Sequence, residues 1–403
     1  MMIWLLGVLL LASLAGLGLR QGAIRVAFSL VGILLGALLA GPLGKLIKPL
    51  LVLVGVKDPL ILHLLPPLLG FIVVSVIFKV AALSVHHKID VHFKYHAGDL
   101  RLALYERLHH RLGLCLGLFN GAVYFILISW VIFALSYWTY QTATAAAEPW
   151  ELRLINRLGK DLQGSGFAKV ARSVDPLPDS FYQTADIAGL LYNNPLLEAR
   201  LSRYPAFLGL SERQEFQSLG KDQELVNMRQ RQDPILAVLK HPGVQGILQN
   251  RELMDMIKAA LVPNLKDLQA FLETGRSAKF DPEPILGRWD FDLTYTMLMV
   301  HKGKPNISSL ELAKLKKAIM GAFSKATFVA TTEHQAILKN VPHAMYAAGG
   351  MPSTDIQTLQ GQWKGGDGKY QLTMAGKEYS ANVEADRITV TGEGMELALV
   401  RED

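Results

Sequence analysis

The chain has 403 residues, of which 50% are hydrophobic and 19% are charged. This composition is too apolar for an ordinary soluble protein, and the length suffices for two or three domains. Residues 1–140 carry 11 Lys and Arg against 4 Asp and Glu, while the rest of the chain carries 30 and 31. Because the excess positive charge flanks apolar runs, it argues against a nucleic-acid partner. The single cysteine, Cys115, excludes an intrachain disulfide and a cysteine-based zinc site.

Four stretches without a charged residue lie near the N-terminus: 1–19, 26–44, 59–78 and 112–147. A membrane span needs about 20 apolar residues, and one charge at the bilayer centre costs about 2.5–3.5 kcal/mol. We therefore predict four transmembrane helices, with Pro66 and Pro67 starting or kinking the third. A signal peptide begins with a positive n-region, and no charge precedes Arg20, so we expect the first helix to be retained.

The basic residues predict the orientation of these helices, because Lys and Arg in short loops favour the cytoplasmic side. A turn at 20–25 and a loop at 79–111 on that side place eight basic residues inside and three outside. The inner set is Arg20, Arg25, Lys79, Lys88, Lys94, Arg101, Arg107 and Arg111, and the outer set is Lys45, Lys48 and Lys57. Residues 142–403 are then translocated, and Trp4, Tyr137, Trp138 and Tyr140 form an aromatic belt at the outer interface. A cytoplasmic C-terminal region is the alternative.

Glycines four residues apart mark two stripes on these helices, one with Gly32 and Gly36 and one with Gly113, Gly117 and Gly121. Small residues at this spacing let helix backbones approach closely in a membrane. We expect packing within the chain, and a pore lining or a dimer seam is the alternative. No Asp, Glu, Lys or Arg falls in the middle of a predicted span, which disfavours a pump or a secondary transporter.

The stretch "GLRQGAIRVAFSLVGILLGALLA" at 18–40 resembles the opening of the CvpA (colicin V production) family of bacterial inner-membrane proteins. Gly18, Arg20, Gly22 and Arg25 match the short Gly-x-Arg-Arg-Gly-x-x-Arg-like turn that joins the first two helices of that family, with Gln21 in place of the second arginine. The later stretch "RLGLCLGLFNGAVYFIL" resembles its glycine-rich last helix. The resemblance covers residues 1–140 and implies a four-helix anchor.

Some members of this family carry a trypsin-like serine protease domain after the four helices. This chain has no Gly-Asp-Ser-Gly-Gly nucleophile loop after residue 140. Without a nucleophilic serine beside a histidine base, that mechanism has no starting point. The resemblance therefore implies the anchor with a different outer region.

Residues 141–284 are predicted to form short helices separated by prolines. The stretches "NNPLLEARLSRYP", "QDPILAVLKHPGVQGIL" and "VPNLKDLQAFLETG" place Asn, Asp or Pro at helix starts, and Gly275 is a predicted helix stop. The pattern faintly resembles the Asp-Pro and Asn-Pro helical arrays of STI1-type co-chaperone modules, which implies a groove for apolar peptides. We favour a helical spacer packed on itself, because helices this short must bury their apolar faces.

From residue 285 the sequence is typical of strands, with one amphipathic helix, "SSLELAKLKKAIMGAF", capped by Ser308 or Ser309. The predicted strands lie in "GRWDFDLTYTMLMV", "ATFVATTEHQAIL", "GQWKGGDGKYQLTM", "KEYSANVEA", "DRITVTG" and "MELALVRE". The pairs Gly287–Trp289 and Gly361–Trp363 resemble the Gly-x-Trp that opens lipocalin-like barrels, where the indole plugs one end of the core. We expect one barrel of six to eight strands with a filled or shallow interior, and not an internal repeat.

The stretch "HHKIDVHFKYH" is the main candidate for a metal site, because His92 and His96 would share a helix face near Asp99. The segment also flanks the membrane, where imidazole and lysine suit the lipid interface. We therefore expect no metal, no cofactor and no catalytic residue, and we do not expect an enzyme.

The sequence thus predicts a multi-domain membrane protein with three segments. These are an all-α four-helix transmembrane domain (1–140), a short-helix spacer (141–284) and a C-terminal antiparallel lipocalin-like β-barrel with one inserted helix (285–403). We expect a bacterial inner-membrane protein with a periplasmic binding or scaffolding domain, and the resemblance implies a loose link to toxin production, export and envelope homeostasis. Expected partners are membrane lipids and envelope proteins. The alternatives are an oligomeric channel or exporter component formed through the glycine stripes, and binding of a lipid or small apolar ligand by the barrel.

Overall fold

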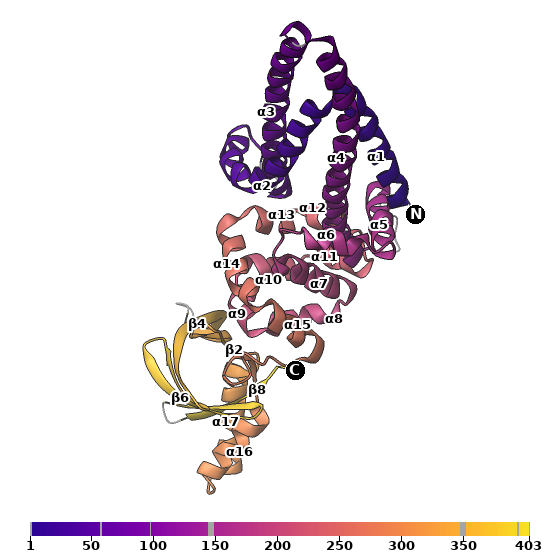
Figure 1. Ribbon diagram of the computed structural model, residues 1–403. Coiled ribbons are helices and arrows are strands. Elements are labelled where there is room, and N and C mark those ends of the chain that lie inside the picture. Colours follow the sequence, from indigo (N-terminus) through magenta and orange to yellow (C-terminus); the bar gives the residue numbers. More distant parts are fainter. Residues whose placement is uncertain are drawn as a thin grey trace. The chain divides into compact units, whose positions relative to one another are not determined.

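The computed structural model describes residues 2–56, 59–96, 98–143, 149–346, 352–392 and 395–402 (Figure 1). The chain divides into two compact units. The first unit is Met1–Gly189 with Gln232–Arg251, and the second is Leu190–Arg231 with Glu252–Asp403. The division cuts through the predicted spacer, because some of its short helices bury their apolar faces on the membrane helices and others pack in the unit that holds the barrel.

Four long helices form the core of the first unit: α1 (Met2–Gln21), α2 (Ala23–Leu53), α3 (Pro59–His96) and α4 (Asp99–Gln141). All four are long and apolar enough to cross a membrane, so this is a membrane protein as predicted. The hydrocarbon core is about 30 Å thick, whereas the 43 residues of α4 span about 65 Å at 1.5 Å per residue. Helix α4 therefore extends well beyond the apolar layer.

The segment 79–111, predicted as a loop, is almost entirely helical. Helix α3 continues to His96 and α4 begins at Asp99, with Gly98 at its N-cap. The prediction was wrong because a run of charged and imidazole side chains ends an apolar span but not a helix, since Lys, Arg, Glu and Leu are good helix formers. Pro66 and Pro67 lie inside α3, and Lys57 of the predicted outer loop lies outside the described residues.

The long helices pack as two pairs, α1 with α4 and α2 with α3, and α2 joins the pairs by its contact with α4. Glycines make the approach possible in both pairs. A Cβ atom on Gly113 would lie 2.3 Å from the carbonyl oxygen of Gly18, and one on Gly117 would lie 2.4 Å from that of Leu14. In the other pair, a Cβ on Gly32 would lie 2.7 Å from the Cβ of Phe78. At these positions the paired helices are too close to accommodate a side chain larger than that of glycine.

Short helices complete the first unit: α5 (Trp150–Gly164), α6 (Phe167–Ser173), α7 (Asp179–Asn193) as far as Gly189, α12 (Ile235–Lys240) and α13 (Pro242–Gln249). Helices α5 to α7 bury Leu162, Ala171 and Tyr182 in one apolar cluster with Ile3 of α1 and Phe133 of α4. We call α5, α6 and α7 the collar. Its apolar faces are thus covered by α1 and α4.

The helices of the second unit precede and interrupt a barrel. They are α8 (Leu196–Arg203), α9 (Pro205–Ser211), α10 (Gln214–Gly220), α11 (Gln223–Gln230), α14 (Arg251–Leu261), the 3₁₀ turn η1 (Val262–Asn264) and α15 (Leu265–Thr274). Gly275 ends α15 with φ of 79°, which confirms the predicted stop. The predicted Asn and Asp caps are wrong at two starts, because the N-cap residues of α8 and α12 are the prolines that follow, Pro195 and Pro234.

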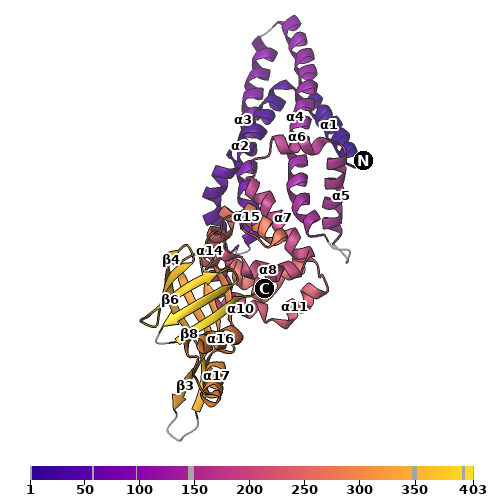
Figure 2. The ribbon, with the colours of Figure 1, turned by 90° about the horizontal axis from the view of Figure 1, so that it is seen from below.

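Eight antiparallel strands close into the predicted barrel, in which each strand pairs with its neighbour in sequence and β1 pairs with β8 (Figure 2). The strands are β1 (Gly287–Phe291), β2 (Thr327–Ala330), β3 (Gln335–Tyr346), β4 (Pro352–Gly366), β5 (Lys369–Met374), β6 (Lys377–Glu384), β7 (Arg387–Gly392) and β8 (Met395–Arg401). The fold class is therefore confirmed.

Two details of the barrel differ from the prediction. The stretch "GRWDFDLTYTMLMV" is not one strand, because the carboxylate of Asp292 accepts a hydrogen bond from the Tyr295 amide at 2.9 Å and caps helix α16 (Leu293–Gly303). Together with α17 (Ser309–Phe323), two helices are inserted between β1 and β2 where one was predicted. The stretch "ATFVATTEHQAIL" divides into β2 and β3 at a turn in which His334 has φ of 60°.

A cluster of large buried side chains occupies the core of the barrel. Trp289, Phe328, Trp363 and Leu372 are at most 2% exposed and belong to one apolar cluster. Large rings of this kind bury about 150–250 Å² each and account for much of the core. The cluster also contains Ile285, Leu286, Ala330, Ala336, Tyr370, Met374, Ala381, Val383, Ile388 and Leu399.

The close approach of α1 and α4 predicts a sharp difference between two glycines. We expect Gly117→Ala to lower the free energy of unfolding by about 1–3 kcal/mol, the usual cost of overpacking, because the new methyl group would overlap the Leu14 carbonyl. Gly16→Ala is the matched control, since its Cβ position has no neighbour within 4 Å apart from the adjacent residues and backbone of its own helix. Thermal unfolding of the two variants in the same detergent measures the difference, and equal midpoints would contradict the packing.

Candidate functional site

The turn between α1 and α2 contains the residues of the predicted cytoplasmic turn, Gly18, Arg20, Gly22 and Arg25. Because α1 ends at Gln21 and α2 begins at Ala23, Gly22 alone makes the turn, with φ of 79°. Its amide donates to the Gly18 carbonyl oxygen at 2.9 Å. A Cβ on Gly22 would lie 1.7 Å from Nε2 of His109 on α4. Gly18 and Gly22 are thus buried against α4, whereas Arg20 is exposed and Arg25 is half-buried.

A column of aromatic rings from α3 and α4 adjoins this turn. The His109 ring, only 8% exposed, stacks on His86 at 5.2 Å and on Tyr105 at 5.1 Å, and Tyr105 stacks on Phe93 at 4.2 Å. The Nε2 of His109, the Nδ1 of His86 and the Nε of Arg25 are buried without a hydrogen-bond partner among the described residues. The turn therefore packs against a stack of aromatic and imidazole rings from α3 and α4 that is largely shielded from solvent.

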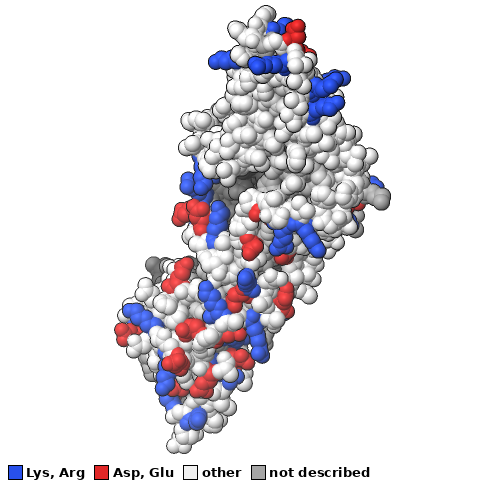
Figure 3. Space-filling view, viewed as in Figure 1, with Lys and Arg blue, Asp and Glu red and all other residues white. Residues whose placement is uncertain are grey.

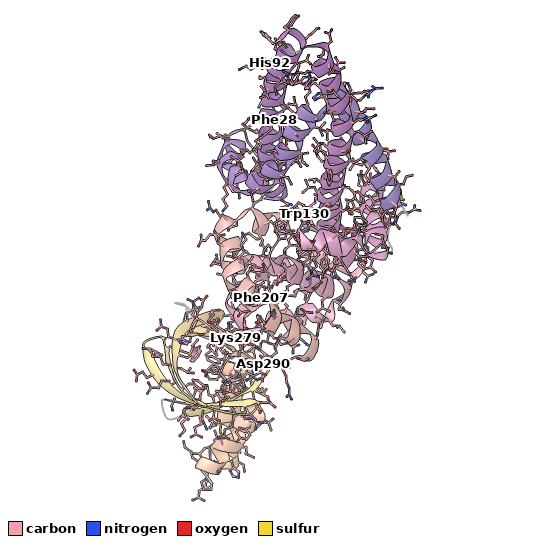
Figure 4. All side chains as sticks on the ribbon, in the orientation of Figure 1. Phe28, His92, Trp130, Phe207, Lys279 and Asp290 are labelled. Carbon is pink, nitrogen blue, oxygen red and sulfur yellow. The ribbon has the colours of Figure 1, made fainter. Side chains whose placement is uncertain are left out.

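The predicted metal candidates take part in stacking of the same kind. His92, labelled in Figure 4, stacks on His96 at 5.5 Å with the rings 9° from parallel. Within the described ranges, no group of three or more His, Cys, Asp or Glu side chains is arranged to hold a metal ion.

Two carboxylates fasten the collar to α4. Asp175 accepts hydrogen bonds from Trp130 Nε1 at 2.8 Å and from the Tyr182 hydroxyl, and Asp186 accepts one from the Tyr137 hydroxyl at 2.8 Å. Trp130 is labelled in Figure 4. Burial and the hydrogen bond to Asp175 raise the pKa of Tyr182, so the phenol stays protonated and remains a donor.

The collar also contacts aromatic residues that were predicted to form a belt at the outer interface, although Trp4 remains 49% exposed. The Trp4 ring meets Phe167 edge to face at 5.1 Å, and the Trp138 ring meets Phe181 at 5.7 Å. Periodicity could not reveal these partners, because they come from helices that follow in sequence. Tyr140 remains 55% exposed, with the ammonium group of Lys160 5.4 Å from its ring.

The first Gly-x-Trp pair closes the barrel together with the last strand. Trp289 is fully buried, and its indole Nε1 donates to the Ile285 carbonyl oxygen at 2.9 Å. The Arg401 guanidinium lies 4.3 Å from the indole centre and donates to the carbonyl oxygens of Leu286 at 2.9 Å and Pro284 at 2.7 Å. One arginine therefore covers the indole and satisfies two buried carbonyl groups.

The second Gly-x-Trp pair lies in β4 and contributes to the same core. Trp363 Nε1 donates to the Thr331 carbonyl oxygen at 3.1 Å, and its ring meets Tyr370 edge to face at 5.6 Å. A Cβ on Gly361 would lie 2.1 Å from the Thr373 carbonyl oxygen, so only glycine permits this strand contact. Because both tryptophans belong to one cluster, the two pairs are parts of a single barrel.

A buried carboxylate fastens α9 to the outer face of the barrel. Glu212, whose side chain is 8% exposed, accepts from Arg288 of β1 at 2.8 Å and from Lys339 of β3 at 2.5 Å. Beside this ion pair, Leu208 packs on Val329 and Ile337. Two cations on one buried carboxylate compensate its desolvation, so removal of the carboxylate would leave both Arg288 and Lys339 without their anionic partner.

A second polar cluster joins α9 to the segment before the barrel. The Tyr204 hydroxyl and Ser277 Oγ both donate to Oδ2 of Asp267, at 2.9 and 2.6 Å. The Lys279 amide donates to Oδ1 of the same carboxylate, and Figure 4 labels this residue. Burial and the hydrogen bond to Asp267 raise the pKa of Tyr204, which keeps its proton.

Arg401, Glu212 and Asp175 are the principal contact residues that the sequence analysis missed. Asp175 precedes a proline and fits the Asp-Pro pattern noted elsewhere in the spacer, so this signal was present. Arg401 and Glu212 have no local signature, because their partners lie 115 and 76 residues away in sequence.

No protein-family model, no curated protein and no solved structure matches this chain.

The contact of Arg401 with Trp289 predicts a localised loss of stability. We expect Arg401→Met to cost about 1–3 kcal/mol, because the carbonyl groups of Pro284 and Leu286 lose their donor. Hydrogen exchange of the full chain should then increase in β1 and β8. The control, Arg276→Met, removes an exposed arginine and should leave exchange unchanged, whereas equal protection in the two variants would show that Arg401 does not close the barrel.

Proposed function

We propose that this chain is a bacterial inner-membrane protein that presents a periplasmic scaffolding domain, and that the domain binds its partners through its outer surface. The filled barrel interior carries the proposal. A carrier of small ligands needs a chamber of about 300–1,000 Å³, whereas here tryptophan, tyrosine and phenylalanine side chains occupy the centre. Partners of the second unit therefore bind to its outer surface in this proposal.

The membrane unit supports the anchor half of the proposal. Many large apolar side chains on α1 to α4 are exposed, among them Leu38 at 72% and Leu5 at 71%, which suits contact with lipid chains. Figure 3 shows a broad zone without charged side chains over these helices, and charged groups gathered at one end of it. The excess of basic residues in the first turn and at 79–111 favours a cytoplasmic position for that end.

The resemblance of residues 1–140 to the CvpA family suggests the cellular process in which the protein takes part. It favours a link to toxin production or export and to envelope homeostasis, with this outer unit as the part that contacts other envelope components. The contacts of Gly18 and Gly22 described above suit a packing role for the turn, and the exposed Arg20 suits retention on the cytoplasmic side.

Packing within the chain weighs against an oligomeric channel. Gly113, Gly117 and Gly121 face α1, and Gly32 and Gly36 face α3. The stripes that a second copy would need are therefore covered by helices of the same chain. A pore built on other faces would lack polar lining, since the exposed residues of these helices are mainly apolar.

Uptake of a fluorescent fatty acid tests the proposed function. We expect the full chain in nanodiscs to bind no more of this probe than nanodiscs of the same lipid without protein, because large buried side chains occupy the barrel core. Saturable binding to wild type that disappears in Ala381→Leu, a variant that adds volume to the core, would identify a ligand chamber and contradict the proposal.

A further inference from the structure

The helical hairpin between β1 and β2 carries a concentrated positive charge. Residues 293–325 contain six lysines and one acidic residue, Glu311. The other residues after 140 contain 24 basic and 30 acidic side chains, so the rest of the outer region is net negative. We call residues 293–325, which comprise α16, α17, their connection and the two residues after α17, the basic hairpin. Its lysines are Lys302, Lys304, Lys314, Lys316, Lys317 and Lys325.

These lysines are free to bind an external anion. All six are exposed, and none forms an ion pair with any residue that the structure describes. Glu311 is occupied in the capping box of α17, where it accepts from the Ser308 amide at 3.2 Å and from its hydroxyl at 2.9 Å. The single carboxylate of the hairpin therefore supports the start of the helix.

Large apolar side chains emerge among the lysines. Leu310 is 67% exposed, Leu298 59% and Met320 46%. Leu310, Lys314 and Lys317 are spaced four and three residues apart and share one exposed side of α17, while Ile319 faces inward at 2% exposure. Helix α17 lies beside β3, so its inner face is already covered (Figure 2). The outer face combines cations with apolar tips.

We propose that the basic hairpin binds the surface of a bilayer that contains anionic phospholipid. Leu298, Leu310 and Met320 enter the interface between head groups and acyl chains, while the lysines contact head-group phosphates and extend their methylene stems along the apolar surface. A nucleic acid or an acidic protein would match the charge but would leave the apolar tips in water. The inference rests on the proposed surface-binding role and names its partner.

Vesicle flotation tests the proposal with the full chain held in nanodiscs of phosphatidylcholine. We expect the nanodiscs to bind vesicles that contain phosphatidylglycerol and not vesicles of phosphatidylcholine alone. Lys314→Gln, Lys316→Gln and Lys317→Gln together should weaken binding by on the order of 100-fold, since each lysine near an anionic surface contributes about 1 kcal/mol. Leu310→Ser should also weaken binding, because its side chain enters the interface.

The matched control replaces three exposed lysines outside the hairpin, Lys266, Lys364 and Lys369, by glutamine. It removes the same charge and should bind vesicles like wild type. Equal binding by the two triple variants would overturn the proposal, as would unchanged binding by Leu310→Ser. Binding of polyglutamate without binding of the anionic vesicles would also overturn it and assign the hairpin to an acidic protein. None of these vesicle-binding results depends on fatty-acid uptake. The fatty-acid experiment therefore tests the proposed function independently of the basic hairpin.

Discussion

The first unit depends on the direct approach of two backbones, α1 and α4. Cβ positions on Gly113 and Gly117 fall within 2.4 Å of carbonyl oxygens of α1, so the two helices meet main chain to main chain. Lipid supplies no hydrophobic force between helices, and such close packing is what holds them together. The collar buries its apolar side chains against both α1 and α4. This packing requires a constant distance between the two helices. The one-residue turn at Gly22 is likewise set by the His109 ring of α4.

The second unit follows another constraint, the filling of a small closed barrel. Eight strands leave an interior just wide enough for side chains, and Trp289 and Trp363 take much of that space. Arg401 covers one indole and Glu212 secures α9 to the barrel exterior, so polar residues serve to seal and attach the barrel. With large side chains in the centre, the groups that can meet a partner lie on the outside, and the basic hairpin carries six exposed lysines there.

Local patterns in the sequence predicted the elements but not their long-range contacts. Charge-free runs predicted the four long helices, and the Gly-x-Trp pairs with short strands predicted the barrel, because both signals depend on residues close in sequence. The loop expected at 79–111 failed because the end of an apolar span is not the end of a helix. The strand expected at 287–300 ends at Phe291, because the Asp292 side chain caps α16 and starts a helix in its place. Contacts such as Arg401 with Trp289 follow only from closure of the barrel.

The orientation of the chain determines which compartment the second unit serves, and a reporter fusion measures it most directly. Alkaline phosphatase folds actively only outside the cytoplasm, so fusion to the C-terminus reports the location of the outer unit in intact cells. The account predicts an active enzyme, and an active fluorescent protein when the same kind of fusion is made after residue 96, between α3 and α4. An inactive phosphatase at the C-terminus, with a fluorescent protein active there instead, would place the second unit in the cytoplasm and contradict the periplasmic scaffold.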